Sequence, residues 1–119
     1  MPITFKDRRG VLIARPLDDE IGADQADEMK QKLLDQVAGK RWVAVDMSGV
    51  RFMDSSGLGV LVAALKATRG EGEMRLFGVQ APVMELFRLT RLDKVFAMDP
   101  NENICVSTLE SDMRGRKSA

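Results

Sequence analysis

Hydrophobic residues in the first half of the chain form two short extended runs, one helical stretch and one continuous run. Residues 3–6 and 11–15 are β-like runs on either side of the polar segment 7–10, which predicts an N-terminal hairpin. Between residues 24 and 38, apolar side chains recur at helical spacing, and Asp24 is the expected N-cap. Residues 42–45 are uninterrupted by polar side chains, which is typical of a strand buried on both faces.

The second half of the chain continues the alternation of helix and strand. Four apolar residues at helical spacing predict one buried helix face: Leu58, Leu61, Val62 and Leu65. Residues 74–78 predict a strand, and Pro82 stands at the first position of a further helix. A last short strand is expected at residues 95–97, before a final helix in which Asp99 is the N-cap and Pro100 the first residue.

The order of these elements is strand, strand, helix, strand, helix, strand, helix, strand, helix. Such alternation predicts an α/β fold with a parallel or mixed sheet. A chain of 119 residues is long enough for one domain, expected over residues 1–110, and residues 111–119 are expected to form a basic, flexible tail. The loop from Asp46 to Gly57 should lie at the carboxyl end of the sheet, where α/β folds place their functional surfaces.

Composition narrows the classes of function. The chain contains no histidine, which removes Ser-His-Asp and Cys-His catalysis and every histidine-bearing metal site. Its one cysteine, Cys105, is expected to be a buried apolar side chain, because a single thiol builds neither an internal disulfide nor a zinc site. These absences largely exclude conventional hydrolytic, redox and zinc enzymes, and we expect no cofactor, no metal and no enzymatic activity.

Charge and hydropathy argue against nucleic acids and membranes as partners. Lys and Arg number 18 and Asp and Glu number 18, so no excess of positive charge favours nucleic acid or an anionic membrane. The first ten residues contain no apolar run typical of a signal peptide, and the longest nearly apolar stretch, residues 58–65, is too short to cross a bilayer. We expect a cytoplasmic protein without membrane insertion.

The segment with the clearest chemical potential is Asp54–Gly59, which reads DSSGLG. Ser55 and Ser56 stand just before a predicted helix, whose first N–H groups are unpaired and carry partial positive charge. A serine there either caps the helix or carries a phosphate that those N–H groups stabilise. The segment matches neither the Walker A pattern nor the dinucleotide fingerprint nor G-x-S-x-G. We expect Phe52 and Met53, just before it, to pack in the core.

Residues 52–61, FMDSSGLGVL, resemble the signature of the anti-sigma factor antagonists, whose fold is the STAS domain. The resemblance covers residues 3–110 and is strongest in the hexamer at 54–59. Other segments support it: residues 20–21, 26–33, 43–48, 81–83 and 89–96. The resemblance implies the STAS fold, with a mixed β-sheet of about four to five strands and about four helices.

The resemblance also implies a mechanism that regulates bacterial transcription by partner switching. Ser55, the first serine after the signature aspartate, corresponds to the phospho-acceptor of the family, with Ser56 as the open alternative. The implied partner is an anti-sigma factor that is a GHKL-type serine kinase. It binds the unphosphorylated antagonist and releases the phosphorylated one, and a PP2C-type phosphatase removes the phosphate. The expected partner-binding residues are Asp24, Asp54, Ser56, Gly57, Leu58 and Gly59, with the core as the open alternative for Leu58.

An acidic run precedes the first helix and extends into it. Residues 18–28 hold six carboxylates and no basic side chain. If this run lies beside the signature, it would attract a basic patch on a partner, and an unpaired phosphate in that interface would cost several kcal/mol. The alternative is a solvated helix start that the helix dipole stabilises.

One residue departs from the pattern of the family. Gly22 stands where many kinase-responsive members carry an aspartate, and Asp24 is the candidate to take its place. The departure keeps open a second function, that of a constitutive, non-phosphorylated STAS scaffold or a transporter-associated protein-binding module. A third class, a small-ligand sensor that holds an anion at residues 54–59, has no nucleotide motif to support it.

Overall fold

The computed structural model describes residues 3–38, 42–68 and 72–118. The strands are β1 (Ile3–Arg8), β2 (Val11–Pro16), β3 (Glu20–Ile21), β4 (Trp42–Asp46), β5 (Phe52–Met53), β6 (Glu73–Phe77) and β7 (Ala97–Asp99). The helices are α1 (Ala23–Val37), α2 (Ser55–Thr68), α3 (Ala81–Leu89) and α4 (Glu102–Ser118), with one 3₁₀ turn, Leu92–Lys94. The predicted hairpin and the predicted alternation of strands and helices are confirmed.

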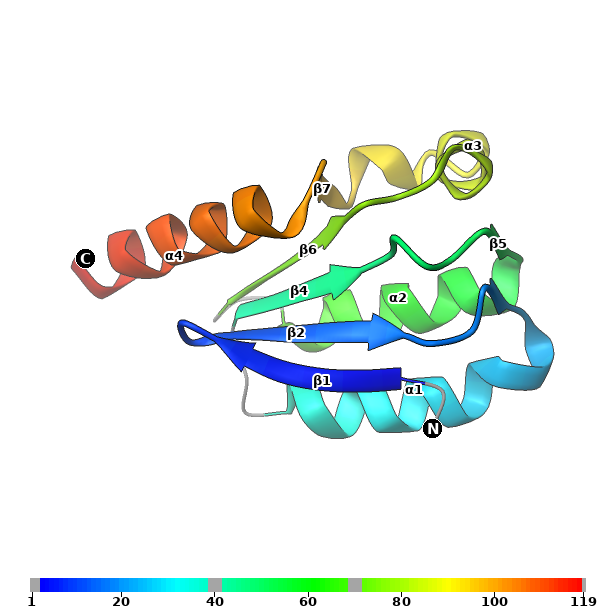
Figure 1. Cartoon of the computed structure of the whole chain (residues 1–119), viewed down its shortest axis with the longest axis horizontal. Helices are drawn as coiled ribbons and strands as arrows, with labels where there is room; N and C mark the ends of the chain where they lie inside the picture. Colours follow the sequence, from blue (N-terminus) through cyan, green and yellow to red (C-terminus); the bar gives the residue numbers. More distant parts are fainter. Residues whose placement is uncertain (1–2, 39–41, 69–71, 119) are drawn as a thin grey trace.

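Five strands form the main sheet, in the order β1-β2-β4-β6-β7 (Figure 1). β1 runs antiparallel to β2, and the other neighbours are parallel, so the sheet is mixed. β3 and β5 form a separate two-stranded parallel ladder at the carboxyl ends of β2 and β4 (Figure 1). The mixed five-stranded sheet with four helices confirms the predicted fold class, and the loop after Asp46 lies at the expected end of the sheet.

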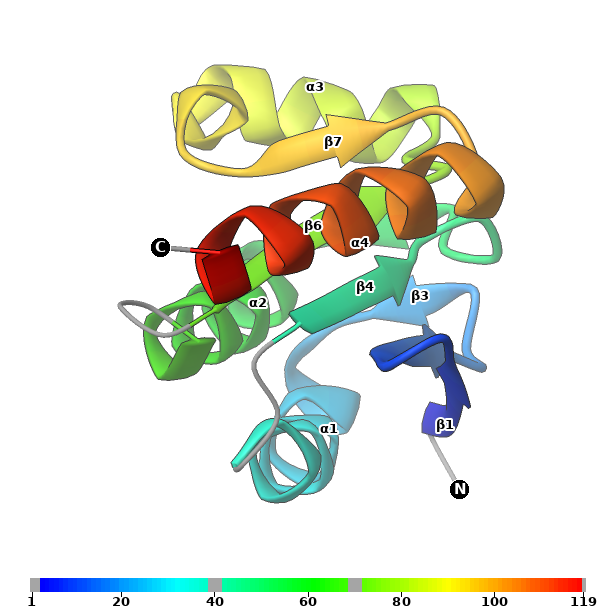
Figure 2. The ribbon, with the colours of Figure 1, turned by 90° about the vertical axis from the view of Figure 1, so that its left-hand side faces the viewer.

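Helices cover both faces of the sheet (Figure 2). Because successive strand side chains point to opposite faces, Leu12 and Val43 join the larger core under α1 and α2, whereas Ile13 and Ala44 join a smaller core under α4. All five residues of β4 are buried, as its continuous apolar run predicts. Cys105 belongs to the smaller core and is fully buried, as expected, and burial raises the pKa of its thiol to about 12.

Two helix starts differ from the sequence prediction. α1 begins at Ala23, one residue before the predicted cap Asp24, and the backbone N–H of Gly22 donates to Gln25 Oε1 at 2.9 Å. Asp99 is not the cap of α4 but the last residue of β7. The Asn101 side chain caps α4 instead, accepting the Ile104 N–H at 3.0 Å.

The cause of the second difference is a tertiary contact. Asp99 accepts two hydrogen bonds from Arg75 on the neighbouring strand β6, at 2.7 and 3.2 Å. A bidentate pair of this kind joins two ionised groups through two hydrogen bonds, whereas an aspartate N-cap bonds to neutral backbone N–H groups. The last strand therefore ends two residues later than predicted, and the helix starts after it.

The predicted flexible tail is helical where the structure describes it. α4 continues to Ser118, beyond the expected boundary at residue 110, and Ala119 lies outside the described residues. Met113 packs against the smaller core, and Arg9 in the hairpin turn pairs with Glu110 at 3.2 Å. These contacts lie on either side of the predicted boundary and extend the helix across it.

The hairpin between β1 and β2 turns through two residues with positive φ. Arg9 has a φ of 54° and Gly10 a φ of 85°, the left-handed pair of a type I′ turn. This turn matches the right-handed twist of the two strands. Arginine at the first position pays the steric penalty of a side chain in the left-handed region, which asparagine largely avoids.

We expect Arg9→Asn to raise the free energy of unfolding by about 1 kcal/mol, because asparagine tolerates the left-handed conformation. Urea denaturation at constant pH measures the change. The variant also loses the exposed ion pair with Glu110, which contributes little. Arg9→Lys retains both the charge and the unfavourable φ, and a stability equal to that of Arg9→Asn would contradict the prediction.

A polar cluster joins β6, β7 and α4. The guanidinium of Arg75 pairs with Asp99 and also with Glu73, at 2.8 Å. Hydrogen bonds to Asp99 raise the pKa of Arg75 further, so this group stays charged. Burial and the neighbouring carboxyl of Asp112 raise the pKa of Glu73, although Arg75 opposes the shift.

The raised pKa of Glu73 predicts a pH dependence of stability. The folded chain holds the Glu73 proton over a pH range in which the unfolded chain has lost it. The contribution of this bound proton to the free energy of unfolding is therefore present at low pH and is lost as pH rises through the folded-state pKa. We expect Glu73→Gln to gain stability relative to wild type between about pH 4 and 7. Urea midpoints across that range test this, with exposed Glu85→Gln as the control for losing one carboxylate. A constant difference between Glu73→Gln and wild type would refute it.

Candidate functional site

Backbone hydrogen bonds hold the acidic run against the signature. β3 pairs with β5, and the carbonyl oxygen of Asp19 accepts the N–H groups of Arg51 and Phe52 at 2.7 and 3.1 Å. The N–H of Asp54 donates to the carbonyl oxygen of Ile21 at 3.3 Å. The passage into α1 and the passage into α2 therefore lie side by side, which the sequence left undecided.

Asp54 is the N-cap of α2. Its Oδ1 accepts the N–H groups of Ser56 and Gly57 at 2.8 and 3.3 Å, and its carbonyl oxygen accepts the N–H of Leu58 at 3.1 Å. Ser55 and Ser56 consequently lie in the first turn of the helix rather than before it. The aspartate takes the capping role that the sequence analysis considered for a serine.

The two serines differ in exposure. The Ser55 side chain is exposed and makes no hydrogen bond within the described part of the chain. Ser56 is half-buried and lines a shallow groove between α1 and α2, next to Asp27 and Lys30. Ser55 thus presents the more accessible hydroxyl at the N-terminus of α2.

The two glycines of the signature have different roles. A Cβ on Gly57 would lie 2.6 Å from both the carbonyl oxygen of Ile21 and the Cγ of Met53, so no side chain fits there. Gly59 is exposed, and a Cβ there would meet nothing within 4 Å. Gly57 is needed for the close approach of α2 to β3, and Gly59 is not.

The structure decides the places of two hydrophobic residues of the signature, one left open by the sequence and one predicted wrongly. Leu58, left open between a partner and the core, is 5% exposed and belongs to the larger core, so it does not form part of the surface. Phe52, expected in the core, is 54% exposed, and the Arg51 guanidinium lies 6.0 Å from the centre of its ring. In the short strand β5 alternate side chains point opposite ways, so Met53 packs against the core and Phe52 does not.

Gly22 lies directly beside Asp54. A Cβ on Gly22 would be 3.2 Å from Asp54 Oδ2, which shows that a side chain at this position would face the cap of α2. Asp24 does not take this place: it is exposed in the first turn of α1 and makes no hydrogen bond or ion pair with a described residue. The residue that folds back on Gly22 is Gln25, which the i, i+3 spacing of a capping box could have indicated.

The described residues offer neither a metal site nor a membrane-spanning helix. Across residues 3–38, 42–68 and 72–118, no three or more Cys, Asp or Glu side chains are grouped so that they could hold a metal ion. No helix in these ranges is long and apolar enough to cross a membrane. The chemistry that the signature does offer is an exposed hydroxyl at a helix N-terminus, next to the capping carboxylate of Asp54.

The model of the STAS domain family matches residues 3–105, so this chain belongs to the STAS domain family. Within it, the chain is similar to the anti-sigma factor antagonists. It is 33% identical over 101 residues to an anti-sigma-B factor antagonist of Listeria monocytogenes, covering 83% of this chain and 82% of the relative. It is also 29% identical over 113 residues to an anti-sigma F factor antagonist of Paenibacillus polymyxa, covering 92% and 96%.

A solved structure shows the same fold. The STAS-domain anti-sigma factor antagonist of Planctomyces limnophilus superposes with a TM-score of 0.82 at 18% identity, covering 90% of this chain and 96% of that one. Sequence family and fold therefore agree. The predicted membership of the anti-sigma factor antagonist family is confirmed.

The contrast between the two glycines leads to a stability prediction. We expect Gly57→Ala to lower the free energy of unfolding by about 1–3 kcal/mol, because the methyl group collides with the Ile21 backbone. Gly59→Ala should leave stability unchanged or raise it by up to about 1 kcal/mol, since alanine favours the helix. Thermal or urea unfolding compares the stabilities of the two variants. Equal effects would show that the close contact at Gly57 does not exclude a side chain.

Proposed function

We propose that this chain is a cytoplasmic anti-sigma factor antagonist that works by phosphorylation-dependent partner switching. Unphosphorylated, it binds an anti-sigma factor that is a GHKL-type serine kinase and so frees the sigma factor. Phosphorylation of Ser55 releases the kinase, and a PP2C-type phosphatase reverses the modification. The observation that supports this best is the exposed Ser55 hydroxyl in the first turn of α2, just after the capping Asp54.

The structure supports Ser55 over Ser56 as the acceptor. A kinase must surround the hydroxyl, and Ser55 is exposed whereas Ser56 is half-buried in the groove against α1. The N–H of Ser56 is already bonded to Asp54 Oδ1, which fixes its place in the first turn. Phosphorylation at Ser56 would require the groove to accept a phosphate beside Asp27.

The local charge gives a physical reason for release. A phosphate adds about −1.5 to −2 charges at one point. Asp54 already occupies the helix N-terminus, and the β3–β5 pairing places the exposed carboxylates of Asp19 and Glu20 beside the same passage. A basic partner surface matched to the unphosphorylated site would face additional charge that it was not built to pair. An unpaired charge in the interface costs several kcal/mol of binding free energy, which is enough to dissociate a micromolar complex.

A second candidate function rests on Gly22. Because a side chain at this position would face Asp54, its absence leaves the site without the aspartate that the family pattern places there. This favours a constitutive protein-binding module, either a scaffold or a partner of a transporter, that is never phosphorylated. The two functions share the same surface and differ only in whether Ser55 is modified.

The variants Ser55→Ala and Ser55→Asp test the switch. With the GHKL-type anti-sigma kinase that this proposal requires, Ser55→Ala should bind within twofold of wild type and incorporate no phosphate from ATP. Ser55→Asp should bind at least tenfold more weakly, about 1.4 kcal/mol, because of its added charge. Calorimetry gives the affinities and intact mass spectrometry the phosphate. Equal affinity of the two variants would refute release by charge, and phosphorylation lost only in the control Ser56→Ala would move the acceptor to Ser56.

The variant Gly22→Asp separates the two functions. The backbone at Gly22 is extended, with a φ of −119°, so an aspartate fits the conformation and needs only a small shift of Asp54. If wild type is phosphorylated by the kinase, the switching function holds. If only Gly22→Asp is phosphorylated, the natural chain is the constitutive module.

A further inference from the structure

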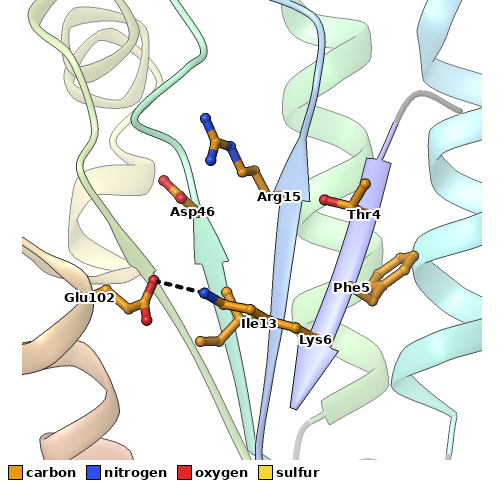
Figure 3. Close-up of a pocket in the computed structure, with 7 residues that line it drawn as sticks. All are labelled: Thr4, Phe5, Lys6, Ile13, Arg15, Asp46 and Glu102. Atoms are coloured by element: carbon orange, nitrogen blue, oxygen red, sulfur yellow. Dashed lines mark ion pairs between the residues drawn. The ribbon is translucent and has the colours of Figure 1, made fainter. Parts of the chain in front are cut away.

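A hollow of about 190 Å³ opens on the face of the sheet opposite α2, beside the start of α4 (Figure 3). Its walls come from β1, β2, β4 and α4. A cavity of about 150 Å³ is enough to take a benzene molecule, so this space has room for a small solute. It lies across the sheet from the helix that carries Ser55 and forms no part of the signature site.

The polar lining of the hollow forms a row across three strands. Thr4 on β1 is the register partner of Arg15 on β2. Asp46 ends β4 one step beyond the pairing of Ala14 with Val45, which puts it next to Arg15 in the same row. Ile13, two residues before Arg15 on β2, points to the same face and provides an apolar floor.

Arg15 and Asp46 are neighbours of opposite charge that do not pair. No described residue forms an ion pair or hydrogen bond with the exposed Arg15. Asp46 is 8% exposed, and its Oδ1 accepts the backbone N–H of Ser48 at 2.9 Å and the Ser48 hydroxyl at 2.6 Å. Both side chains line the hollow, and Figure 3 shows them next to each other, with the Asp46 carboxylate at the end of β4 and the Arg15 guanidinium reaching up beside it from β2.

Two further residues of opposite charge, Lys6 and Glu102, line the hollow. Glu102 at the start of α4 pairs closely with Arg8 at 2.6 Å and loosely with Lys6 at 3.6 Å (Figure 3). The Lys6 side chain is 62% exposed, so its loose pair contributes little and can be exchanged for a ligand. The hollow is therefore lined by two cations and two carboxylates, with no net charge.

We propose that this hollow binds a small zwitterion of the α-amino acid class. The ligand carboxylate accepts hydrogen bonds from the forked Arg15 guanidinium, and the hydroxyl of Thr4, the register partner of Arg15, adds a donor. The ligand ammonium donates to the Asp46 carboxylate. A simple anion would meet the repulsion of Asp46 and Glu102, and a simple cation that of Arg15 and Lys6, whereas a zwitterion pairs with both signs.

Titration of the ¹⁵N-labelled full chain with L-alanine tests the proposal. We expect saturable shifts of the Arg15 Nε–H and of the β2 amides, with a millimolar dissociation constant. Arg15→Met should weaken binding at least tenfold. Arg88→Met removes an exposed cation of α3, remote from the hollow, and should leave the affinity within twofold. Both side chains lie at the surface, so neither variant should compromise folding.

Two single-charge probes, acetate and methylammonium, complete the design. Both should bind at least tenfold more weakly than L-alanine, because each leaves one charge of the pair unmatched. Acetate binding as tightly as L-alanine would make the hollow a simple anion site and refute the proposal. So would the absence of saturable shifts up to about 100 mM, or shifts that persist unchanged in Arg15→Met.

Discussion

The close approach of α2 to the backbone of β3, at Gly57, is the constraint on which the site depends. The missing side chain lets the helix sit against the Ile21 carbonyl, and the same carbonyl accepts the N–H of Asp54. This contact ties together two segments that are more than thirty residues apart in the chain, the acidic passage and the signature. The exposed hydroxyl, the capping carboxylate and the acidic surface share one end of the molecule because this contact holds.

The two faces of the sheet are attached to their helices in different ways. α1 and α2 pack on the sheet through the larger apolar core, which includes Phe87 and Phe96 in edge-to-face contact. α4 covers a smaller core and forms ion pairs with the hairpin, and its Asp112 lies beside the Glu73 carboxyl of β6. Apolar contacts respond little to pH and salt, whereas ion pairs and the carboxyl pair at Glu73 respond to both. The signature thus lies on the face whose helices are held by apolar contacts. The hollow beside α4 lies on the face whose ion pairs respond to pH and salt.

The sequence predicted the regular elements well and their ends less well. The hairpin, the buried strand β4 and the helices follow from periodicity because each has a continuous apolar pattern. The predicted cap of α4, Asp99, is wrong and Asn101 caps the helix, because Asp99 is held by Arg75 from another strand and no local pattern reports such a pair. The two-residue strands β3 and β5 were too short to give any periodicity. The tail became a helix because of contacts to Arg9 and the smaller core.

Within the site, the sequence indicated which chemical groups are present but not the direction in which each side chain points. The sequence by itself determined the family, the α/β class and the presence of a serine pair near a helix start, because these depend on residue types in consecutive positions. Only the tertiary structure decided that Phe52 faces solvent and Leu58 the core, that Gly22 rather than Asp24 faces Asp54, and that the acidic run lies against the signature. Those outcomes depend on the pairing of β3 with β5, a contact between distant segments whose register the residues of either one alone do not specify.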